Sequence, residues 1–186
     1  MITISEKPII LPLSEYLWGT KEETEKGRVL LSRSGTVLKV SFKVEAKELR
    51  REVLENNGNV YEDSCAEIFL KKKDSKEYYN FEFSASGAML IGKGENRNER
   101  VRLTEPYFDK VKRSVTVIEN TNLKAIWTLD IELDLAAFDL VSSSLMGNIY
   151  LCGDKLKETV FISLFDIDII KPDFHRPDFF GEFTFL

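Results

Sequence analysis

Hydrophobic and polar residues alternate with a period of two along most of this chain. In residues 36–45 every second position, from Leu38 to Val44, is apolar, and the positions between them are lysine or serine. Residues 124–133 repeat the pattern around Trp127. Because successive side chains of a strand point to opposite faces of a sheet, this alternation predicts strands with one buried and one hydrated face.

Further apolar stretches extend this pattern. The segments 64–70 and 77–84 are separated by the polar run 71–76, which predicts a hairpin with an exposed loop. Additional strands are predicted at residues 87–92, 115–119, 147–152, 160–164 and 182–186. About ten short strands separated by turn residues indicate an all-β fold, an antiparallel β-sandwich with little helix.

Helix is expected in only two places. Residues 46–58 contain helix formers, with Leu49 and Val53 spaced for one face, and end in Asn-Asn-Gly, which predicts one short helix. Residues 134–138 predict a single turn capped by Asp134. Neither segment is long enough to change the fold class.

The composition indicates one globular domain covering residues 1–186. A chain of 186 residues with 43% apolar residues can bury one sizeable core, and neither an internal repeat nor a shift in composition marks a domain boundary. The 26 basic and 31 acidic residues give a net charge of -5, which offers no basic field to nucleic acid or anionic lipid. No apolar run approaches the roughly 20 residues of a membrane-spanning helix. We therefore expect neither a nucleic-acid nor a membrane partner.

The first residues and the two cysteines indicate the compartment. Charged residues and Pro8 interrupt the start of the chain, which lacks the basic start and continuous apolar stretch of a secretory signal. Cys65 and Cys152 lie in apolar, strand-like surroundings, which favours buried free thiols over a disulfide. These features predict a cytoplasmic protein, or a secreted or periplasmic one if a leader has been removed.

The single histidine of the sequence, His175, argues against two kinds of chemistry. A nucleophilic triad needs a base beside a serine or cysteine, and a histidine-ligated metal site usually needs more than one imidazole. Residues 92–100 begin with Gly-Lys-Gly but lack the remaining glycines and the lysine-hydroxyl pair of a phosphate loop. We therefore interpret residues 92–100 as a long polar loop without a phosphate site.

The predicted hairpin carries polar residues on one of its faces. Alternation places Glu67 beside apolar neighbours, where a carboxylate must be hydrogen-bonded, paired with a cation or bound to a metal. On the next strand Tyr78, Asn80 and Glu82 share a face, while the aromatic residues between them face the core. An aromatic ring, an amide and a carboxylate together suit a sugar. The same region leaves open a glycosidase-like acid and base pair, drawn from Glu62, Asp63, Glu67 and Glu82.

Four blocks of the sequence resemble the family 9 carbohydrate-binding modules, in their stand-alone or glycosidase-linked branch. The blocks are VYEDSCAEIFL, YYNFEFSASG, GNIYLCGDKL and PDFHRPDFFGEFTF, and they occur in the order of the family between Val60 and the C-terminus. The resemblance implies a β-sandwich that binds the terminal sugar of a glycan in a slot between two aromatic side chains. It also implies bound calcium and an activity that is binding without bond cleavage.

Carried over onto this sequence, the resemblance implies a set of ligand-binding residues. The two slot aromatics are Tyr61 and Phe174, and the carboxylate that faces the sugar is Glu67. The neighbouring contacts are Asn80, Glu82 and Tyr150. His175 has two interpretations, a hydrogen bond that holds the closing loop or a direct contact with the ligand.

For calcium the sequence offers oxygen donors but no calcium-loop spacing. The candidate donors are Glu62, Asp63, Asp154, Asp166, Asp168 and Asp173. We expect bound calcium from the resemblance alone and assign no metal ligand.

Two departures from the family pattern keep the function open. Leu164 stands where this branch has a tryptophan, and Leu151 stands where it has a lysine. The tyrosine and phenylalanine of the slot also offer less stacking area than tryptophan. Carbohydrate binding is the favoured hypothesis, and the alternatives are a glycoside hydrolase and a structural or interaction sandwich that has lost sugar binding.

Overall fold

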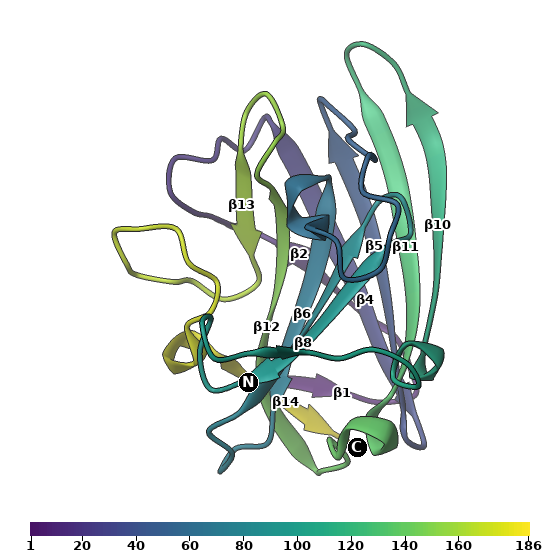
Figure 1. Ribbon diagram of the computed structural model, residues 1–186, viewed down its shortest axis with the longest axis vertical. Helices are drawn as coiled ribbons and strands as arrows, with labels where there is room; N and C mark the ends of the chain where they lie inside the picture. Colours follow the sequence, from purple (N-terminus) through teal and green to yellow (C-terminus); the bar gives the residue numbers. More distant parts are fainter.

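The computed structural model describes all residues from Met1 to Leu186. Its regular secondary structure is almost entirely β-strand, arranged in two sheets, which confirms the predicted all-β sandwich (Figure 1). The larger sheet contains β1 (Ile2–Ile4), β3 (Glu15–Tyr16), β6 (Cys65–Lys71), β7 (Tyr78–Ser84), β8 (Met89–Gly94), β9 (Val101–Arg102), β12 (Ser144–Gly153), β13 (Val160–Ser163) and β14 (Gly181–Phe185). The smaller sheet contains β2 (Ile9–Leu13), β4 (Glu25–Ser34), β5 (Val37–Ala46), β10 (Val111–Asn120) and β11 (Ala125–Asp134). The only helices are the 3-10 turns η1 (Val60–Glu62), η2 (Phe108–Lys110), η3 (Leu135–Phe138) and η4 (Pro177–Phe179). No helix has the length and apolar character that crossing a membrane requires.

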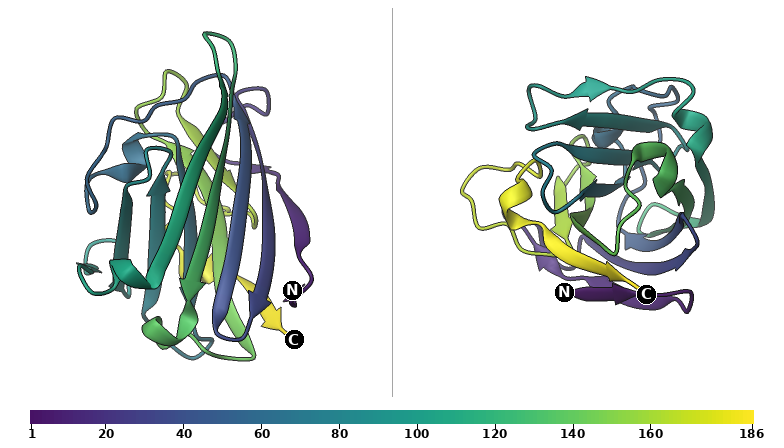
Figure 2. Two further views of the ribbon diagram at one scale, coloured as in Figure 1. Left: turned by 90° about the vertical axis from the view of Figure 1, so that its right-hand side faces the viewer. Right: turned by 90° about the horizontal axis from the view of Figure 1, so that it is seen from below.

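The strand order brings distant parts of the chain together. The larger sheet runs β1-β14-β12-β6-β7-β8-β9, and the smaller sheet runs β10-β11-β5-β4-β2. All neighbouring strands are antiparallel except β1 and β14, which lie side by side and bring the two ends of the chain close together (Figure 2). The β10–β11 hairpin extends beyond the rest of the sandwich in the same figure.

The space between the two sheets holds the main hydrophobic core. Alternation along β5 and β11 points Phe42 and Trp127 inward, as predicted, and both side chains are buried. Ile68 of β6 and Phe81 of β7 belong to the same cluster from the larger sheet. Because burial of each such side chain stabilises the fold by about 1.5–3 kcal/mol, this core holds the two sheets together.

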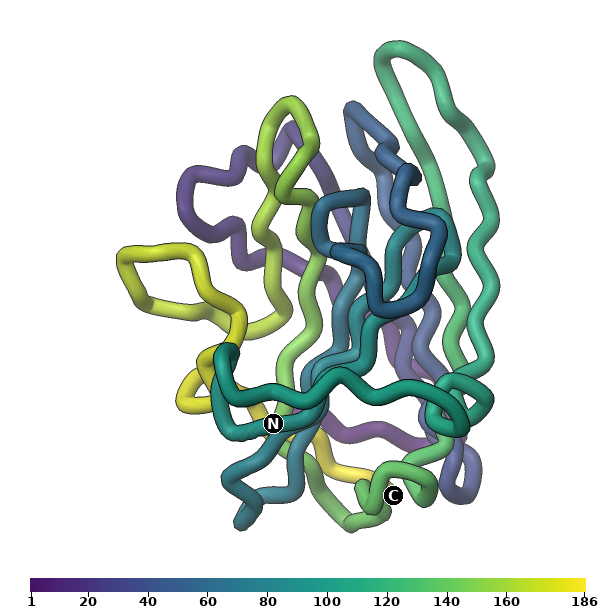
Figure 3. Tube along the Cα trace, in the orientation of Figure 1, coloured from purple at the N-terminus to yellow at the C-terminus, as the bar shows by residue number.

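The larger sheet is also covered on its outer face. β6 and β7 are buried along almost their whole length on both faces. A second, smaller hydrophobic cluster that includes Phe69, Tyr78 and Tyr150 lies on this outer side. Figure 3 shows the chain after β8 and the chain between β13 and β14 on this side of the molecule. The outer face of the larger sheet is therefore a second interior, into which polar side chains also point.

The segment between β13 and β14 starts where two strands separate. β12 pairs with β14 over its first half and with β13 over its second half. At this division the buried Asn148 amide donates to the carbonyl of Phe165 at 2.9 Å, and its oxygen accepts from the Phe165 N–H at 3.0 Å. Asn148 thus holds the start of the segment that carries Phe174 and His175.

The helix predicted for residues 46–58 is wrong. From Lys47 onward the segment is irregular, because its backbone N–H groups have side-chain acceptors elsewhere in the chain. The N–H groups of Glu52 and Val53 donate to the Asp63 carboxylate at 3.0 and 2.8 Å, which removes the need for intrahelical bonds. The turn predicted at residues 134–138 is confirmed as η3, in which Asp134 accepts a backbone N–H at 3.1 Å.

Candidate functional site

The register of β12, β6 and β7 gathers polar side chains in rows on the outer face of the larger sheet. Glu67 lies opposite Tyr150 on β12 and opposite Glu82 on β7. The next row along the same face pairs Cys152 with Cys65. Since directly opposed residues have Cβ atoms about 4.5–5.5 Å apart, strand pairing alone brings two carboxyl groups and two thiols together.

A cavity of about 280 Å³ opens over these rows. Seven residues were predicted from the sequence as ligand contacts. Five of them line this cavity: Tyr61, Glu67, Glu82, Phe174 and His175. The other two, Asn80 and Tyr150, are fully buried beneath the lining. The structure therefore brings the proposed residues together, in two layers.

Tyr150 and Asn80 each contact a residue of the lining. The ring of Tyr150 stacks on Phe174 at 4.1 Å and 12°, and its hydroxyl donates to the Phe174 carbonyl at 3.3 Å. The Asn80 amide donates to Glu82 Oε1 at 2.7 Å. These contacts orient the cavity wall from below.

Aromatic side chains form part of the cavity wall. Phe174 is 8% exposed and packs against Trp18 and Phe161, with ring centroids at 5.6 and 5.8 Å. Tyr61, which η1 carries, lines the same cavity. Because Phe174 is stacked on Tyr150, only a small part of its ring is open to a ligand, and Trp18 adds aromatic surface beside it.

Trp18 lines the cavity but was not among the ligand contacts predicted from the sequence. It lies in a tight turn in which Trp18 and Gly19 both have positive φ, 48° and 86°, and the Thr20 N–H donates to the Leu17 carbonyl at 3.0 Å. The Trp18 indole N–H donates to the Ile169 carbonyl at 2.8 Å. A positive φ at a non-glycine residue costs about 1–2 kcal/mol, so this turn holds the indole at the cavity against a backbone preference.

The two carboxyl groups of the cavity are buried. Glu67 Oε1 accepts from the Cys152 thiol at 2.9 Å, and Glu82 Oε1 accepts from Arg100 at 3.3 Å. Burial raises the pKa of Glu67 well above its ordinary value, and the neighbouring Glu82 raises it further. Burial also raises the pKa of Glu82, against the opposite effect of Arg100. Glu82 Oε2 has no hydrogen-bond partner, so one acceptor on the cavity floor is unused.

Three arginines reach the cavity from the segment that follows β8. They are Arg97, Arg100 and Arg102. Residues 92–100 were predicted to be a polar loop without a phosphate site; residues 92–94 instead end β8, and the role of Arg97 and Arg100 in the cavity was not predicted. The sequence held only a partial signal: a buried acid on β7 needs a cation, but nothing local showed that the chain after β8 crosses the same face.

His175 contacts both the covered sheet and the cavity. Its Nδ1 is hydrogen-bonded to the Tyr78 hydroxyl at 2.8 Å, and its ring lies 4.9 Å from that of Phe69. Burial, with help from Arg100 and Arg97, lowers the pKa of His175 to about 2. The imidazole is thus neutral near neutral pH, and its bond to Tyr78 fits the loop-holding interpretation.

The two departures from the family pattern lie away from the cavity. Leu151 is fully buried in the core between the sheets, and Leu164 packs against the same core. Among the calcium candidates, the Asp63 carboxylate is occupied by donors from Glu52, Val53 and Ser84. Calcium stays a prediction.

Comparison with known proteins agrees with this fold. A sequence profile described as carbohydrate-binding family 9 matches residues 5–185. A structure from Bacteroides uniformis, provisionally described as a carbohydrate-binding protein, has a TM-score of 0.87 at 25% identity and covers 100% of this chain and 99% of its own. No curated protein matches the sequence.

Two more distant structures come from a family 9 carbohydrate-binding module of Caldicellulosiruptor kristjanssonii. The complex with glucose has a TM-score of 0.62 at 13% identity and covers 100% of this chain and 95% of its own. The complex with cellotriose has a TM-score of 0.56 at 14% identity, with coverage of 99% and 92%. At these identities the likeness concerns the sandwich fold.

Proposed function

The chain belongs to carbohydrate-binding family 9, and on that premise we propose that it binds the end of a mono- or oligosaccharide in the cavity over the larger sheet, without cleaving it. The observation that carries the proposal is the composition of this single cavity, which combines an aromatic wall with buried carboxyl groups and arginines. Glucose and cellotriose, the ligands of the two Caldicellulosiruptor complexes, are the first sugars to test.

The cavity chemistry suits a sugar ring. The rings of Trp18 and Tyr61 provide apolar surface for the C–H face of a sugar. A guanidinium such as that of Arg97 can donate two parallel hydrogen bonds to adjacent hydroxyls, and Glu67 and Glu82 can accept from others. A site built this way discriminates strongly between ligands, because a missing hydroxyl leaves a buried polar group unpaired.

The size of the cavity favours a chain end. Its volume of about 280 Å³ lies at the lower limit of ordinary ligand pockets, which span roughly 300–1,000 Å³. Such a space accommodates few sugar rings, and the rest of a longer glycan would lie outside it. The proposed ligand is therefore a terminal sugar or a short oligosaccharide.

The arrangement of the carboxyl groups supports binding over hydrolysis. Glycosidases place an acid and a base or nucleophile on either side of the scissile bond. Glu67 and Glu82 instead lie next to each other on one sheet face, and burial raises the pKa of both. Glu62 is paired with Lys155 at 2.8 Å, and Asp63 accepts backbone N–H bonds, so neither is free for catalysis.

Isothermal titration calorimetry tests the proposal on the full chain, in calcium, a zinc-selective chelator and a non-thiol reductant. We expect saturable 1:1 heats with glucose, cellotriose or another member of a panel of hexoses, pentoses and oligosaccharides. Glu67→Gln should weaken binding at least about tenfold, equivalent to about 1.4 kcal/mol. Glu132→Gln, on the outer face of the smaller sheet, is the matched control and should bind like the unmodified chain.

Two results would contradict the proposal. One is the absence of heat with every sugar at millimolar concentration. The other is binding that Glu67→Gln leaves unchanged, because the sugar would then lie outside this cavity. Turnover of aryl glycosides, assayed in parallel, should be absent.

A further inference from the structure

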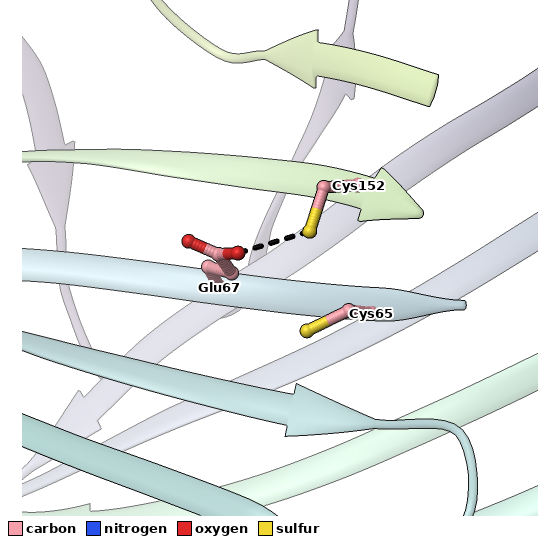
Figure 4. A group of neighbouring side chains, drawn as sticks. All are labelled: Cys65, Glu67 and Cys152. Atoms are coloured by element: carbon pink, nitrogen blue, oxygen red, sulfur yellow. Dashed lines mark hydrogen bonds between the residues drawn. The ribbon is translucent and has the colours of Figure 1, made fainter. Parts of the chain in front are cut away.

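Two thiols and a carboxylate meet on the cavity floor. The Sγ atoms of Cys65 and Cys152 and a carboxylate oxygen of Glu67 all lie within 4.8 Å of one another. Figure 4 shows Cys65 and Glu67 projecting from β6 and Cys152 from β12, with the Cys152 thiol directed at the Glu67 carboxylate. The proposed sugar contacts use neither cysteine.

The three ligand atoms are close to the spacing of a metal site. In a tetrahedral zinc site, Zn–S of about 2.3 Å and Zn–O of about 2.0 Å place the ligand atoms roughly 3.5–3.8 Å apart. The 2.9 Å between Cys152 Sγ and Glu67 Oε1 would need to lengthen by less than about 1 Å, and the widest separation would need to shorten by a similar amount. Small side-chain rotations on fixed strands supply such changes.

From this geometry we propose that Cys65, Cys152 and Glu67 bind one thiophilic divalent cation, with Zn²⁺ as the ligand that the donors suit best. Two thiolates and a carboxylate match zinc, and three protein ligands leave a fourth position open. Cys152 and Glu67 line the cavity and Cys65 lies beneath them, so an ion has a route to the site.

A second observation concerns an unpaired acceptor beside the three ligand residues. Glu82 lies directly opposite Glu67, and its Oε2 atom is buried without a hydrogen-bond partner. Arg100 is the one basic side chain hydrogen-bonded to this pair of acids, through Glu82 Oε1. The floor thus has an unused acceptor on the residue opposite Glu67, which a water molecule bound to an ion at Glu67 can satisfy.

Ion binding requires the ligands to lose protons. Cys65 and Cys152 are both free thiols, and an ordinary thiol carries its proton near neutral pH. Each thiol that becomes a ligand releases one proton to solvent, and Glu67 releases another when it is protonated. The apparent affinity should therefore fall as the pH is lowered.

The site goes beyond carbohydrate binding and does not depend on it. The two hypotheses share Glu67, whose two oxygens can serve an ion and a hydroxyl separately. The sugar titration in chelator and the metal titration without sugar have separate readouts. Failure of one therefore leaves the other standing.

Titration of the reduced full chain with Cd²⁺ tests the proposal, because cadmium bound to thiolate has an ultraviolet charge-transfer band. We expect the band to saturate at one Cd²⁺ per chain and to disappear when Zn²⁺ is added. Cys65→Ser and Cys152→Ser should each abolish the saturable band, and Glu67→Gln should weaken binding at least about tenfold. Glu132→Gln should leave the titration unchanged.

Several results would overturn the metal site. One is the absence of a band in the reduced, unmodified chain, a measurement that does not depend on how the variants fold. A second is a saturable band that persists in both cysteine variants. A third is a protein that has no free thiol before reduction and binds no metal after reduction. That result would indicate that the two cysteines form a disulfide.

Discussion

The two outer faces of the sandwich carry similar residues in different environments. On the smaller sheet, Lys39 and Glu132 form an ion pair at 3.6 Å with side chains 52% and 43% exposed. On the larger sheet, Arg100 and Glu82 form a pair at 3.3 Å with side chains 16% and 3% exposed. Both acids occupy alternating positions on a strand, so the difference arises from the loops that cover one face.

Loop cover, and not the strand pattern, distinguishes the two polar sheet faces. An exposed ion pair contributes little because water already solvates both charges. Under cover, each acid needs a donor or a cation, and atoms such as Glu82 Oε2 that lack one are available to a ligand. The cavity over the larger sheet therefore holds a buried, unpaired acceptor, whereas the acid of the ion pair on the smaller sheet is open to water.

Glu25 is a buried acid without a cation partner, so it shows the effect of burial alone. Its substitution should have the largest effect on the free energy of unfolding. Its carboxyl group is 1% exposed, has no hydrogen-bond partner, and burial raises its pKa to about 8. Because the folded-state pKa is raised, its contribution to stability is present below the unfolded pKa of about 4.5 and is lost as the pH rises through about 8. Glu25→Gln should remove this loss. At pH 9 the free energy of unfolding of the variant should therefore be larger than that of the unmodified chain, by on the order of 4 kcal/mol.

Urea unfolding at pH 4.5 and pH 9 measures this effect. The two proteins should be similar at the lower pH and differ at the higher one. Glu22→Gln, an exposed acid nearby, should follow the unmodified chain at both. Equal stability of Glu25→Gln and the unmodified chain at pH 9 would refute the claim that burial alone sets this pKa.

Removal of Arg100 tests the covered face directly. Arg100→Ala leaves Glu82 buried without its cation, which should lower the free energy of unfolding by about 3 kcal/mol at neutral pH. Lys39→Ala, which removes the cation of the exposed pair, should change it by no more than about 0.5 kcal/mol. Equal losses in the two variants, measured by urea unfolding, would remove the distinction between the faces.

The aromatic wall gives a smaller effect that concerns binding. Trp18→Ala removes indole surface from the cavity and should weaken sugar binding about tenfold or more in calorimetry. Ile118→Ala, which removes an exposed apolar side chain of β10, should bind sugar normally. Normal binding by folded Trp18→Ala would exclude the indole from the site.

The sequence predicted the sheet faces well because alternation is a local property. It placed Glu82 on the face of its strand that points away from the core and Trp127 in the core, as the structure has them, but it did not predict that the first of these faces is covered. It missed β4, where Gly27 and the apolar run after it interrupt the alternation. A Cβ at Gly27 would lie 2.3 Å from Cδ1 of Leu151, so that side chain would have to move.

The loop residues of the site could not be placed in the same way. Arg100 reaches Glu82 only because β8 pairs with β7 and the chain then crosses that face. Trp18 reaches the cavity through a turn with positive φ at a bulky residue, which no propensity predicts. Both positions depend on contacts between segments far apart in the sequence.

The two tryptophans allow one experiment to test whether a sugar binds in the cavity over the larger sheet. Trp18 lines the cavity and Trp127 is buried between the sheets, so their indole N–H signals report on the two places separately. In ¹⁵N-correlated NMR spectra, assigned with Trp127→Phe, saturating sugar should shift the Trp18 signal and leave the Trp127 signal in place. A sugar that binds while the Trp18 signal stays unchanged would contradict the assignment of the cavity as the binding site.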